Sequence, residues 1–522
     1  MSSEQIHNRD SVNSILISSS WAYRLELSNP SEMSLPFISN IMRIPAIQRQ
    51  STLWLISTIG ITFFGFISTM LFSHLLGKDL MGVYYLFLAY YGVFNMIGDG
   101  GFGQAAVKRI SEGNDQNAYI TAYASLRALL IIVSTLLLLL LSPYFIDLQS
   151  YDLVLWIIIA LTASFFGHTV TYGIYGLGHV GIYSIANGIS EFVRIVFQII
   201  AVLLGFSVFG LFGGVIAGII ISGIICLKYF TFKPAKFSFR HISSLAVYGF
   251  WIFLIGTGSI VFAYADTIFI GYFMTNGDVG VYRTAYQFTS LAGFLALAIT
   301  TTLTPKISHW SANNQMDRIS PAVTRGITMS LILAIPVAFG GILLSERLLY
   351  FFYGADFAAG STVCWILLVM QIIAVFTLLL GVGLTASDHA RQAFYAAGIA
   401  ALLNIVLNVT LIPIFGINGA AVATLISYTL NAILISHFLK RYITIRLELL
   451  PIAHIIIASL VMALFVFIYI RFIPLDNVLV TLIPVIIGAL VYVFVLLKLD
   501  HGIRDEIAGM VTTFGLPWPK WL

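Results

Sequence analysis

Six ionisable residues lie inside or at the ends of long apolar runs of this chain: Asp99, Arg127, Glu191, Arg194, Asp266 and Arg283. A charged side chain is costly in hydrocarbon, so a residue of this kind is either paired with another or marks a binding or transport site. Arginine presents a planar set of donors that suits a phosphate group. A carboxylate at depth suits a proton or a cation. These residues therefore either form structural pairs or mark a binding or transport site.

The three arginines each allow two interpretations. Arg127 follows the start of its run by about two turns, so it either contacts a phosphate or extends to the headgroups. Arg194 is the deepest, and Glu191 lies one turn before it on the same helical face. The two residues form either a local ion pair or part of a cavity site. Arg283 lies one turn into its run and serves either the outer part of a substrate path or a surface anchor.

The other polar residues inside the apolar runs also allow both a structural and a functional interpretation. Asp266 and Arg283 are expected at similar depth on neighbouring spans, which predicts a salt bridge; the alternative is a carboxylate that couples transport to a proton or cation. Asp99 stands among glycines, where a structural cap or gate is favoured over ion binding. Asn404 and Asn408 share one helical face and are predicted to hydrogen-bond to other helices or to line the cavity.

Composition places the chain among polytopic membrane proteins. Apolar residues make up 59% of the 522 residues and charged residues 9%, with a mean hydropathy of +0.97; soluble domains carry about 25% charged residues. The basic residues are spread over short loops, so nucleic-acid binding is not expected. The two cysteines lie in apolar runs, and no metal-ligand spacing, nucleotide-binding loop or catalytic motif is found. We expect no metal and no cofactor.

A spanning helix needs about 20 mostly apolar residues, and fourteen runs qualify. They begin near Ser51, Val83, Tyr119, Leu153, Ile182, Val208, Leu245, Val279, Thr324, Ser361, Arg391, Ile417, Pro451 and Asn477. If the N-terminus is cytoplasmic, twenty of the 26 Lys and Arg residues fall on the cytoplasmic side and three on the other. This bias predicts fourteen spans with both termini in the cytoplasm.

The chain also repeats itself. Gly82-Val83-Tyr84 and Gly280-Val281-Tyr282 each follow a polar turn and open an apolar run, and those runs end in Arg109-Ile110-Ser111 and Lys306-Ile307-Ser308. With this spacing, spans one to six and seven to twelve are parallel repeats about an axis along the membrane normal. The predicted fold is all-α, with two six-helix lobes and two extra C-terminal helices.

The domain boundaries follow from this count. The prediction comprises a cytoplasmic, disordered tail, a first lobe, a second lobe, spans thirteen and fourteen, and a cytoplasmic tail with a helix at the membrane interface. The corresponding ranges are 1–45, 46–232, 233–442, 443–498 and 499–522.

Several segments, in their order and spacing, resemble the polysaccharide and O-antigen flippases of the multidrug/oligosaccharidyl-lipid/polysaccharide exporter superfamily. The resemblance covers residues 45–500. Unlike the flippases of the peptidoglycan precursor, this chain has no arginine in span one or in the membrane part of span two. The similar segments are Gly98–Gly103 with Lys108–Ser111, Ala265–Gly271, Val279–Ala285, Leu403–Ile405, Ile412-Pro413 and Gly416–Thr424.

The resemblance implies a cell-membrane protein that is not an enzyme. It implies that the protein flips a lipid-linked oligosaccharide, a polyprenyl phosphate or diphosphate glycan, to the outer leaflet, with charged residues in a central cavity. Membrane lipids are the other expected partners, together with glycosyltransferases or a polymerase of the same pathway. Two alternatives stay open: a cation-coupled multidrug exporter of the same superfamily, and a membrane-embedded glycosyltransferase or polymerase. The latter usually carries a large hydrophilic loop, and no loop here has that length.

Overall fold

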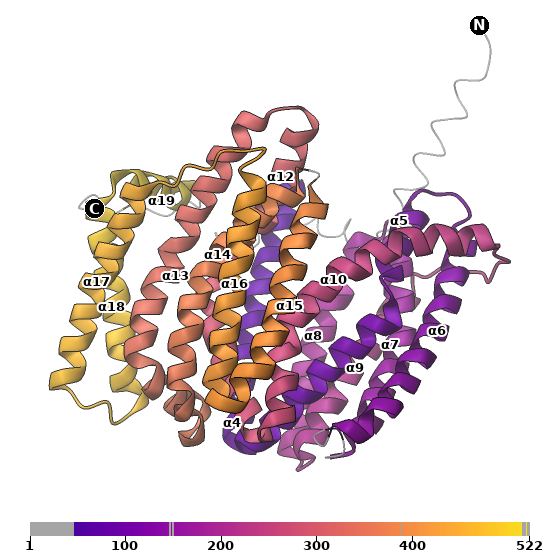
Figure 1. Ribbon diagram of the computed structural model, residues 1–522, viewed down its shortest axis with the longest axis horizontal. Helices are drawn as coiled ribbons and strands as arrows, with labels where there is room; N and C mark the ends of the chain where they lie inside the picture. The colour runs from indigo at the N-terminus through magenta and orange to yellow at the C-terminus, as the bar shows by residue number, and fades with distance from the viewer. Residues whose placement is uncertain (1–45, 146–147, 149–150, 388, 514–517, 519–522) are drawn as a thin grey trace, which may run out of the picture. The chain divides into compact units, whose positions relative to one another are not determined.

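Helices make up nearly all of the chain in the computed structural model, which describes residues 46–145, 148, 151–387, 389–513 and 518 (Figure 1). The predicted disorder of residues 1–45 lies outside the described residues. The helices are α4 Ala46–Asp99, α5 Phe102–Ser111, α6 Gln116–Leu141, α7 Leu153–Gly176, α8 Val180–Leu203, α9 Ser207–Leu227, α10 Phe239–Phe273, α11 Asn276–Ser290, α12 Phe294–Ala312, α13 Met316–Tyr353, α14 Ser361–Thr385, α15 Ala390–Phe415, α16 Ile417–Leu439, α17 Leu449–Phe472, α18 Val478–Leu499 and α19 His501–Thr513.

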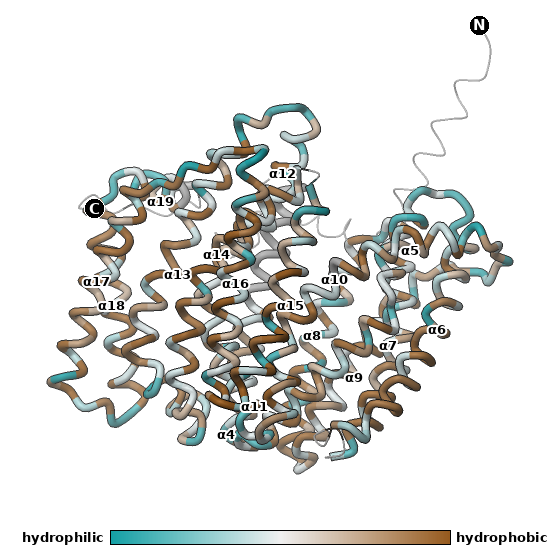
Figure 2. Tube along the Cα trace, viewed as in Figure 1, coloured by the Kyte–Doolittle hydropathy of each residue, from teal (hydrophilic) through white to brown (hydrophobic). Residues whose placement is uncertain are grey.

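Thirteen helical stretches in the described ranges are long and apolar enough to cross a membrane. Their brown, hydrophobic bodies and teal, hydrophilic connections are visible in Figure 2. Several helices extend past the predicted spans, because apolar composition marks only the part of a helix that lies in hydrocarbon. For example, α13 begins at Met316, although the predicted span begins near Thr324.

The first of these stretches folds back on itself. Gly77, inside α4, has φ 74° and ψ 177°, which is not helical. Thr69 lies eight residues before Gly77, and Tyr85 lies eight residues after it. Both bond to the side-chain amide of Gln287, each at 3.1 Å. In a continuous helix those two residues would stand about 24 Å apart. The chain therefore reverses at Gly77, and the thirteen stretches make the fourteen crossings predicted from the sequence.

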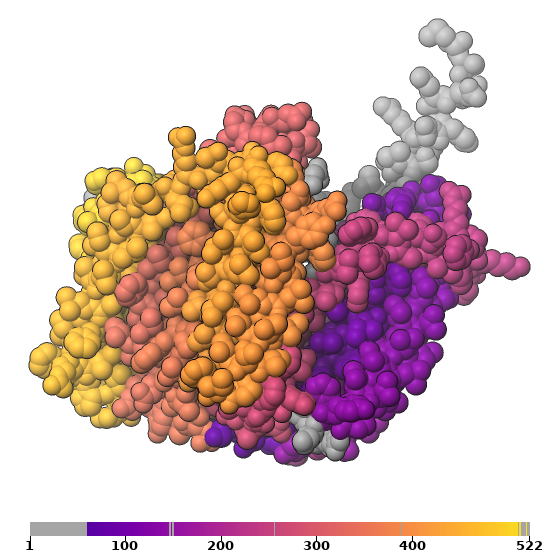
Figure 3. Space-filling model, in the orientation of Figure 1, coloured from indigo at the N-terminus to yellow at the C-terminus, as the bar shows by residue number. Residues whose placement is uncertain are grey.

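The two halves of residues 60–503, which form one compact unit, repeat the same packing. In the first half α8 and α7 both pack on α9, and in the second half α15 and α14 both pack on α16. Outside this repeat, α17 and α18 lie against α13 at one edge (Figure 3). The fold is thus the predicted pair of helical lobes followed by two extra spanning helices.

The equivalent glycines of the repeat meet each other. A Cβ on Gly82 would lie 1.7 Å from the carbonyl oxygen of Asn276, and a Cβ on Gly280 would lie 2.1 Å from the carbonyl oxygen of Lys78. The contact is reciprocal, as a two-fold axis between the halves requires. Neither position can take a larger residue without separating the two backbones.

The second span is broken near its other end. It runs from the latter half of α4 through Gly100 and Gly101, at φ 57° and 75°, into α5. A Cβ on Gly101 would lie 2.2 Å from the carbonyl oxygen of Gly249 in α10. The eighth span is likewise interrupted, by a 3-10 turn at Leu291–Gly293 between α11 and α12. Broken helices of this kind place polar backbone groups inside a membrane protein.

Candidate functional site

Arg127, on α6, is fully buried in a network of polar side chains from three helices. Its Nη1 donates to Asp99 Oδ1 at 2.5 Å and to the Tyr123 hydroxyl at 3.0 Å. Its Nη2 lies 3.2 Å from Asn95 Oδ1, 3.3 Å from Ser164 Oγ and 3.1 Å from His168 Nδ1; the last two are on α7. The guanidinium neither extends to the headgroups nor lies free for a ligand.

Asp99 connects this network to the break in the second span. Its Oδ1 also accepts from the Tyr123 hydroxyl at 3.1 Å, and its Oδ2 accepts the backbone N–H of Gly103 at 3.2 Å, in the first turn of α5. A carboxylate beside the first N–H groups of a helix satisfies donors that have no partner inside the helix. Asp99 therefore acts as the structural cap favoured from the sequence, and Arg127 neutralises it.

Asp266, on α10, lies in a second buried network, and none of its described partners is a cation. Its Oδ2 accepts the hydroxyls of Tyr282 and Thr424, each at 2.5 Å. Its Oδ1 accepts from Asn408 Nδ2 at 2.6 Å and from Asn404 Nδ2 at 3.4 Å. The donors come from α11, α15 and α16, so four helices of the second half meet at one carboxylate that is 6% exposed.

The salt bridge predicted between Asp266 and Arg283 is not formed in the described structure, and that prediction is corrected here. Adjacent residues on a helix point about 100° apart, because one turn takes 3.6 residues. Tyr282 is directed at Asp266, so Arg283 is directed elsewhere. One polar atom of the network also has no partner among the described residues: the buried Oδ1 of Asn408 is an acceptor without a donor.

Arg283 lies instead among tyrosines from both lobes. Its Nη1 donates to the backbone oxygen of Ala263 at 2.9 Å. Its guanidinium lies 5.8 Å from the ring centres of Tyr85 and Tyr264 and 5.1 Å from that of Tyr286. Tyr85 is on α4, in the first half. The side chain is only partly buried and forms no ion pair with a described residue. Its remaining donors can therefore bind an anion without first breaking a salt bridge.

Arg194 and Glu191, both on α8, form the local ion pair that was one of the two interpretations. Arg194 Nη2 lies 2.5 Å from Glu191 Oε2, with side-chain exposures of 28% and 42%. One turn further, Gln198 donates to the Tyr84 hydroxyl at 3.1 Å and to the backbone oxygen of Leu211 at 2.8 Å. The pair lies on the partly exposed face of α8.

Several members of these networks were not identified from the sequence as site residues. Tyr123 bonds to Asp99, and Tyr282 and Thr424 bond to Asp266. Tyr85 and Tyr286, like Tyr264, surround the arginine. Tyrosine and threonine are common in spanning helices, so their type alone gives no signal; a polar residue adjacent in sequence to an in-span charge, such as Tyr282, was the available clue.

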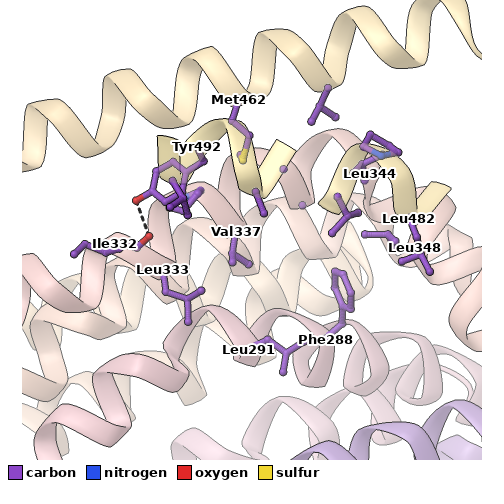
Figure 4. A pocket seen from close by; sticks show the side chains of 18 of the residues that line it. Phe288, Leu291, Ile332, Leu333, Val337, Leu344, Leu348, Met462, Leu482 and Tyr492 are labelled. Atoms are coloured by element: carbon purple, nitrogen blue, oxygen red, sulfur yellow. Dashed lines mark hydrogen bonds between the residues drawn. The ribbon is translucent and has the colours of Figure 1, made fainter. Parts of the chain in front are cut away.

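An apolar cavity of about 560 Å³ lies between the second half and the two C-terminal spanning helices (Figure 4). Phe66 of α4 and Phe288 of α11 line one side of it, Pro336 of α13 another, and Met462 of α17 and Tyr492 of α18 the third. The hydroxyl of Tyr492 is satisfied by the backbone oxygen of Ile332 at 2.7 Å. The lining of the cavity is therefore almost entirely apolar.

These features define a helical membrane protein with polar side chains buried inside and between two similar lobes. The family model described as "polysaccharide biosynthesis protein" matches residues 49–311, and the one described as MatE matches residues 258–410. The first match covers half of the chain, and the chain belongs to the polysaccharide biosynthesis protein family.

Two curated relatives are from Haloferax volcanii. The chain is 28% identical over 363 residues to the "Probable low-salt glycan biosynthesis flippase Agl15", covering 70% of this chain and 75% of that protein. It is 28% identical over 383 residues to the "Probable flippase AglR", covering 72% and 79%.

Two solved structures share the fold. The lipid II flippase MurJ in an inward closed conformation aligns with a TM-score of 0.71 at 19% identity, covering 87% of this chain and all of that one. An inward-facing multidrug resistance MATE transporter aligns with a TM-score of 0.57 at 14% identity, covering 73% and 94%. Identities this low support the fold alone.

Proposed function

We propose that the protein flips a lipid-linked oligosaccharide, a polyprenyl phosphate or diphosphate glycan, from the cytoplasmic to the outer leaflet of the cell membrane by alternating access. The observation that carries the proposal is Arg283: an arginine inside a spanning segment, free of any ion pair with a described residue and flanked by tyrosines of both lobes. Family membership and the two glycan-pathway relatives named flippases support it.

Arg283 is the proposed phosphate ligand. A guanidinium forms short, charge-assisted hydrogen bonds to phosphate oxygens, and here it needs no rearrangement to do so. The partly exposed rings of Tyr264 and Tyr286 offer flat apolar faces to the sugars beside that phosphate. The ring of Tyr85, which is buried and whose hydroxyl donates to Gln287, supports the guanidinium from the first half. Because these rings come from both lobes, a movement of one lobe against the other would change the contacts of the cargo.

The other residues proposed from the sequence take different roles. Asn404 and Asn408 act through Asp266, to which they donate, and not on the cargo directly. Arg127 and Asp99 hold the broken second span. Arg194, paired with Glu191, is a secondary candidate for phosphate. These assignments follow from the hydrogen bonds of each side chain.

Asp266 is the proposed coupling residue. Burying a carboxylate beside neutral donors alone is costly, and the Asn408 oxygen nearby lacks a donor. A proton or a monovalent cation on Asp266 would remove both deficits. Since Tyr282 and Arg283 are neighbours on α11, a change in the charge of Asp266 acts directly on the helix that carries the phosphate ligand.

The apolar cavity beside α17 and α18 is the proposed place for the polyprenyl tail. It is lined by Phe66, in the first span, and by Phe288, on the same helix α11 as Arg283. A cargo with its phosphate at Arg283 can therefore keep its tail in this cavity. No hydrophobic surface has to cross the polar interior.

A reconstituted system tests the proposal. The full chain is placed in vesicles with an isoprenoid diphosphate that carries a fluorescent disaccharide, and access of a membrane-impermeant quencher to the label is followed over time. We expect transfer between leaflets with the unaltered chain, at least tenfold less with Arg283→Gln and partial recovery with Arg283→Lys, which keeps the charge but loses the planar fork. If the unaltered chain transferred the glycolipid no faster than protein-free vesicles do, the proposal would be overturned.

The multidrug exporter remains the second candidate, because a MatE model matches residues 258–410 and Asp266 lacks a cation. The same vesicles discriminate between the two. An exporter would accumulate a lipophilic cation such as ethidium in an ion-dependent way and leave the glycolipid in its original leaflet.

The predicted topology and lobe boundaries complete the proposal. Both termini lie in the cytoplasm, the lobes comprise residues 46–232 and 233–442, and enzymes that assemble or polymerise the glycan act on either side of the transfer. Reporter fusions after Asn477 and Lys498 should report outside and inside, respectively.

A further inference from the structure

The segment that joins the two halves, residues 228–240, carries four basic residues and no acidic one. It runs from the end of α9 at Leu227 to the start of α10 at Phe239. Because both helices are spanning segments, the joining segment lies at a membrane boundary. The four basic residues are Lys228, Lys233, Lys236 and Arg240, all exposed, and none forms an ion pair with a residue that the structure describes.

The segment is held in place by its backbone and by two aromatic side chains. The N–H of Lys233 donates to Asn117 Oδ1 at 3.3 Å, and the N–H of Ala235 donates to Thr121 Oγ1 at 3.1 Å; both acceptors are at the start of α6. Phe230 and Phe232 stack on each other at 5.4 Å and pack against the hydrophobic cluster under α5 and α6. The segment is thus a fixed surface and not a free linker.

Its end is fixed as well. Ser238 caps α10 through a reciprocal arrangement with His241, whose Nδ1 accepts the N–H of Ser238 at 3.0 Å. The start of α10 lies beside α5 and α6 in Figure 1. With the backbone of the segment held in this way, its exposed side chains point away from the protein.

Three aromatic rings accompany the basic side chains on the outward face. Tyr229 is 45% exposed, Phe237 36% and Phe239 80%. An exposed phenylalanine at a membrane boundary suits the zone between headgroups and acyl chains, and clustered basic residues suit anionic headgroups. The general excess of Lys and Arg in cytoplasmic loops would explain the positive charge of the segment. It does not explain why exposed aromatic rings lie between the basic residues on a segment that is held in place.

We propose that residues 228–240 form a binding surface for anionic phospholipid headgroups, with Lys228, Lys233, Lys236 and Arg240 contacting phosphates and Phe237 and Phe239 inserted beside them. The surface is distinct from the Arg283 site and independent of the cargo. Because it joins the two halves, lipid bound there holds the first half and the start of α10 at a set depth in the membrane.

The test compares two variants that lose the same charge. In the first, all four basic residues of the segment are changed to glutamine. In the matched control, four exposed basic residues elsewhere on the predicted cytoplasmic side are changed: Lys306→Gln, Arg318→Gln, Lys440→Gln and Arg446→Gln. The full-length proteins are purified from mixed phosphatidylglycerol and phosphatidylcholine, and the phosphatidylglycerol retained per protein is measured.

One basic side chain near an anionic surface changes binding roughly fivefold, so we expect the segment variant to retain at least tenfold less phosphatidylglycerol and the control to match the unaltered protein. Phe237→Ser with Phe239→Ser, which keeps every charge, should weaken retention by a smaller factor. On the unaltered protein, raising salt from about 0.05 to 0.5 M should release the lipid, which tests the surface even if the four-residue variant does not fold.

Three outcomes would overturn the proposal. The segment variant could retain lipid like the unaltered protein, or the control could lose as much as the segment variant. Alternatively, farnesyl diphosphate could displace phosphatidylglycerol from the unaltered protein at equal concentration but not from the segment variant; the surface would then serve a diphosphate cargo instead of the membrane.

Discussion

Two carboxylates inside the spanning segments, the partly buried Asp99 and the buried Asp266, are stabilised in opposite ways. Asp99 has a guanidinium 2.5 Å away, and that arginine is itself held by five side chains. Asp266 has four neutral donors and no cation among its described partners. The ion pair of Asp99 and Arg127, with partners on three helices, fixes one arrangement of those helices, whereas Asp266 has no counterion among the described residues. The pair in the first half thus holds the broken second span in place, and Asp266 in the second half is the proposed coupling residue.

The largest expected effect is the loss of the paired arginine. Arg127→Ala leaves the partly buried Asp99, whose side chain is 19% exposed, without its cation. Breaking a buried pair typically costs about 3–5 kcal/mol, and the exposure of Asp99 places the expected loss at the lower end, so the melting temperature in detergent should fall by several degrees. Arg127→Gln with Asp99→Asn removes both charges and should recover most of that loss. A single Arg127→Ala variant as stable as the unaltered chain would contradict the description of this pair as structural.

Asp266→Asn should separate stability from transport. Asparagine has the shape of a protonated carboxyl, and the hydroxyls of Tyr282 and Thr424 can still donate to its oxygen. Its NH2 group can donate to Asn408 Oδ1, which has no donor among the described residues, once the Asn408 amide turns over, so stability should change by less than about 1 kcal/mol. Transfer of the fluorescent glycolipid should nevertheless fall at least tenfold and lose its dependence on pH or on the added ion. A large loss of stability with normal transfer would make Asp266 a second structural carboxylate like Asp99.

The exposed pair on α8 should matter least for stability. Glu191→Gln with Arg194→Gln removes a partly exposed ion pair, worth about 0–1 kcal/mol, and we expect glycolipid transfer within about threefold of the unaltered rate. Measuring this double variant beside Arg283→Gln decides between the two arginines. A tenfold loss in the double variant would restore Arg194 as a phosphate ligand.

Asp500 is a third carboxylate, outside the spanning segments, with a backbone N–H and a histidine as partners. It accepts the N–H of Ile503 at 2.9 Å and lies 3.0 Å from His454 Nδ1. Burial alone would raise the pKa of its carboxyl, but the Ile503 N–H and His454 outweigh that effect and lower the pKa. Because a lowered pKa stabilises the folded state above the unfolded value near 4, Asp500→Asn should lower the melting temperature at pH 7 by a few degrees. The difference should shrink as pH falls below 4, and a constant difference would exclude this linkage.

The sequence predicted the crossings better than the contacts between them. Apolar runs and basic residues report which segments lie in the membrane, and local spacing reports partners on one helix, as for Glu191 and Arg194. The contact of Arg127 with Asp99 joins two helices whose rotation about their own axes is set by packing, which one sequence does not reveal. The Asp266–Arg283 prediction was wrong for that reason: similar depth was taken for proximity, and one residue of offset turned the arginine away.

The reciprocal contact of Gly82 and Gly280 bears on ion leakage. Each glycine touches a carbonyl oxygen of the other half, so bare backbone meets bare backbone with no room for a side chain or a hydrated ion between. While this contact lasts, the two backbones exclude ions at this point between the halves. Gly82→Ala should therefore make vesicles that contain the protein conduct protons or small ions under a membrane potential, even in the absence of any cargo.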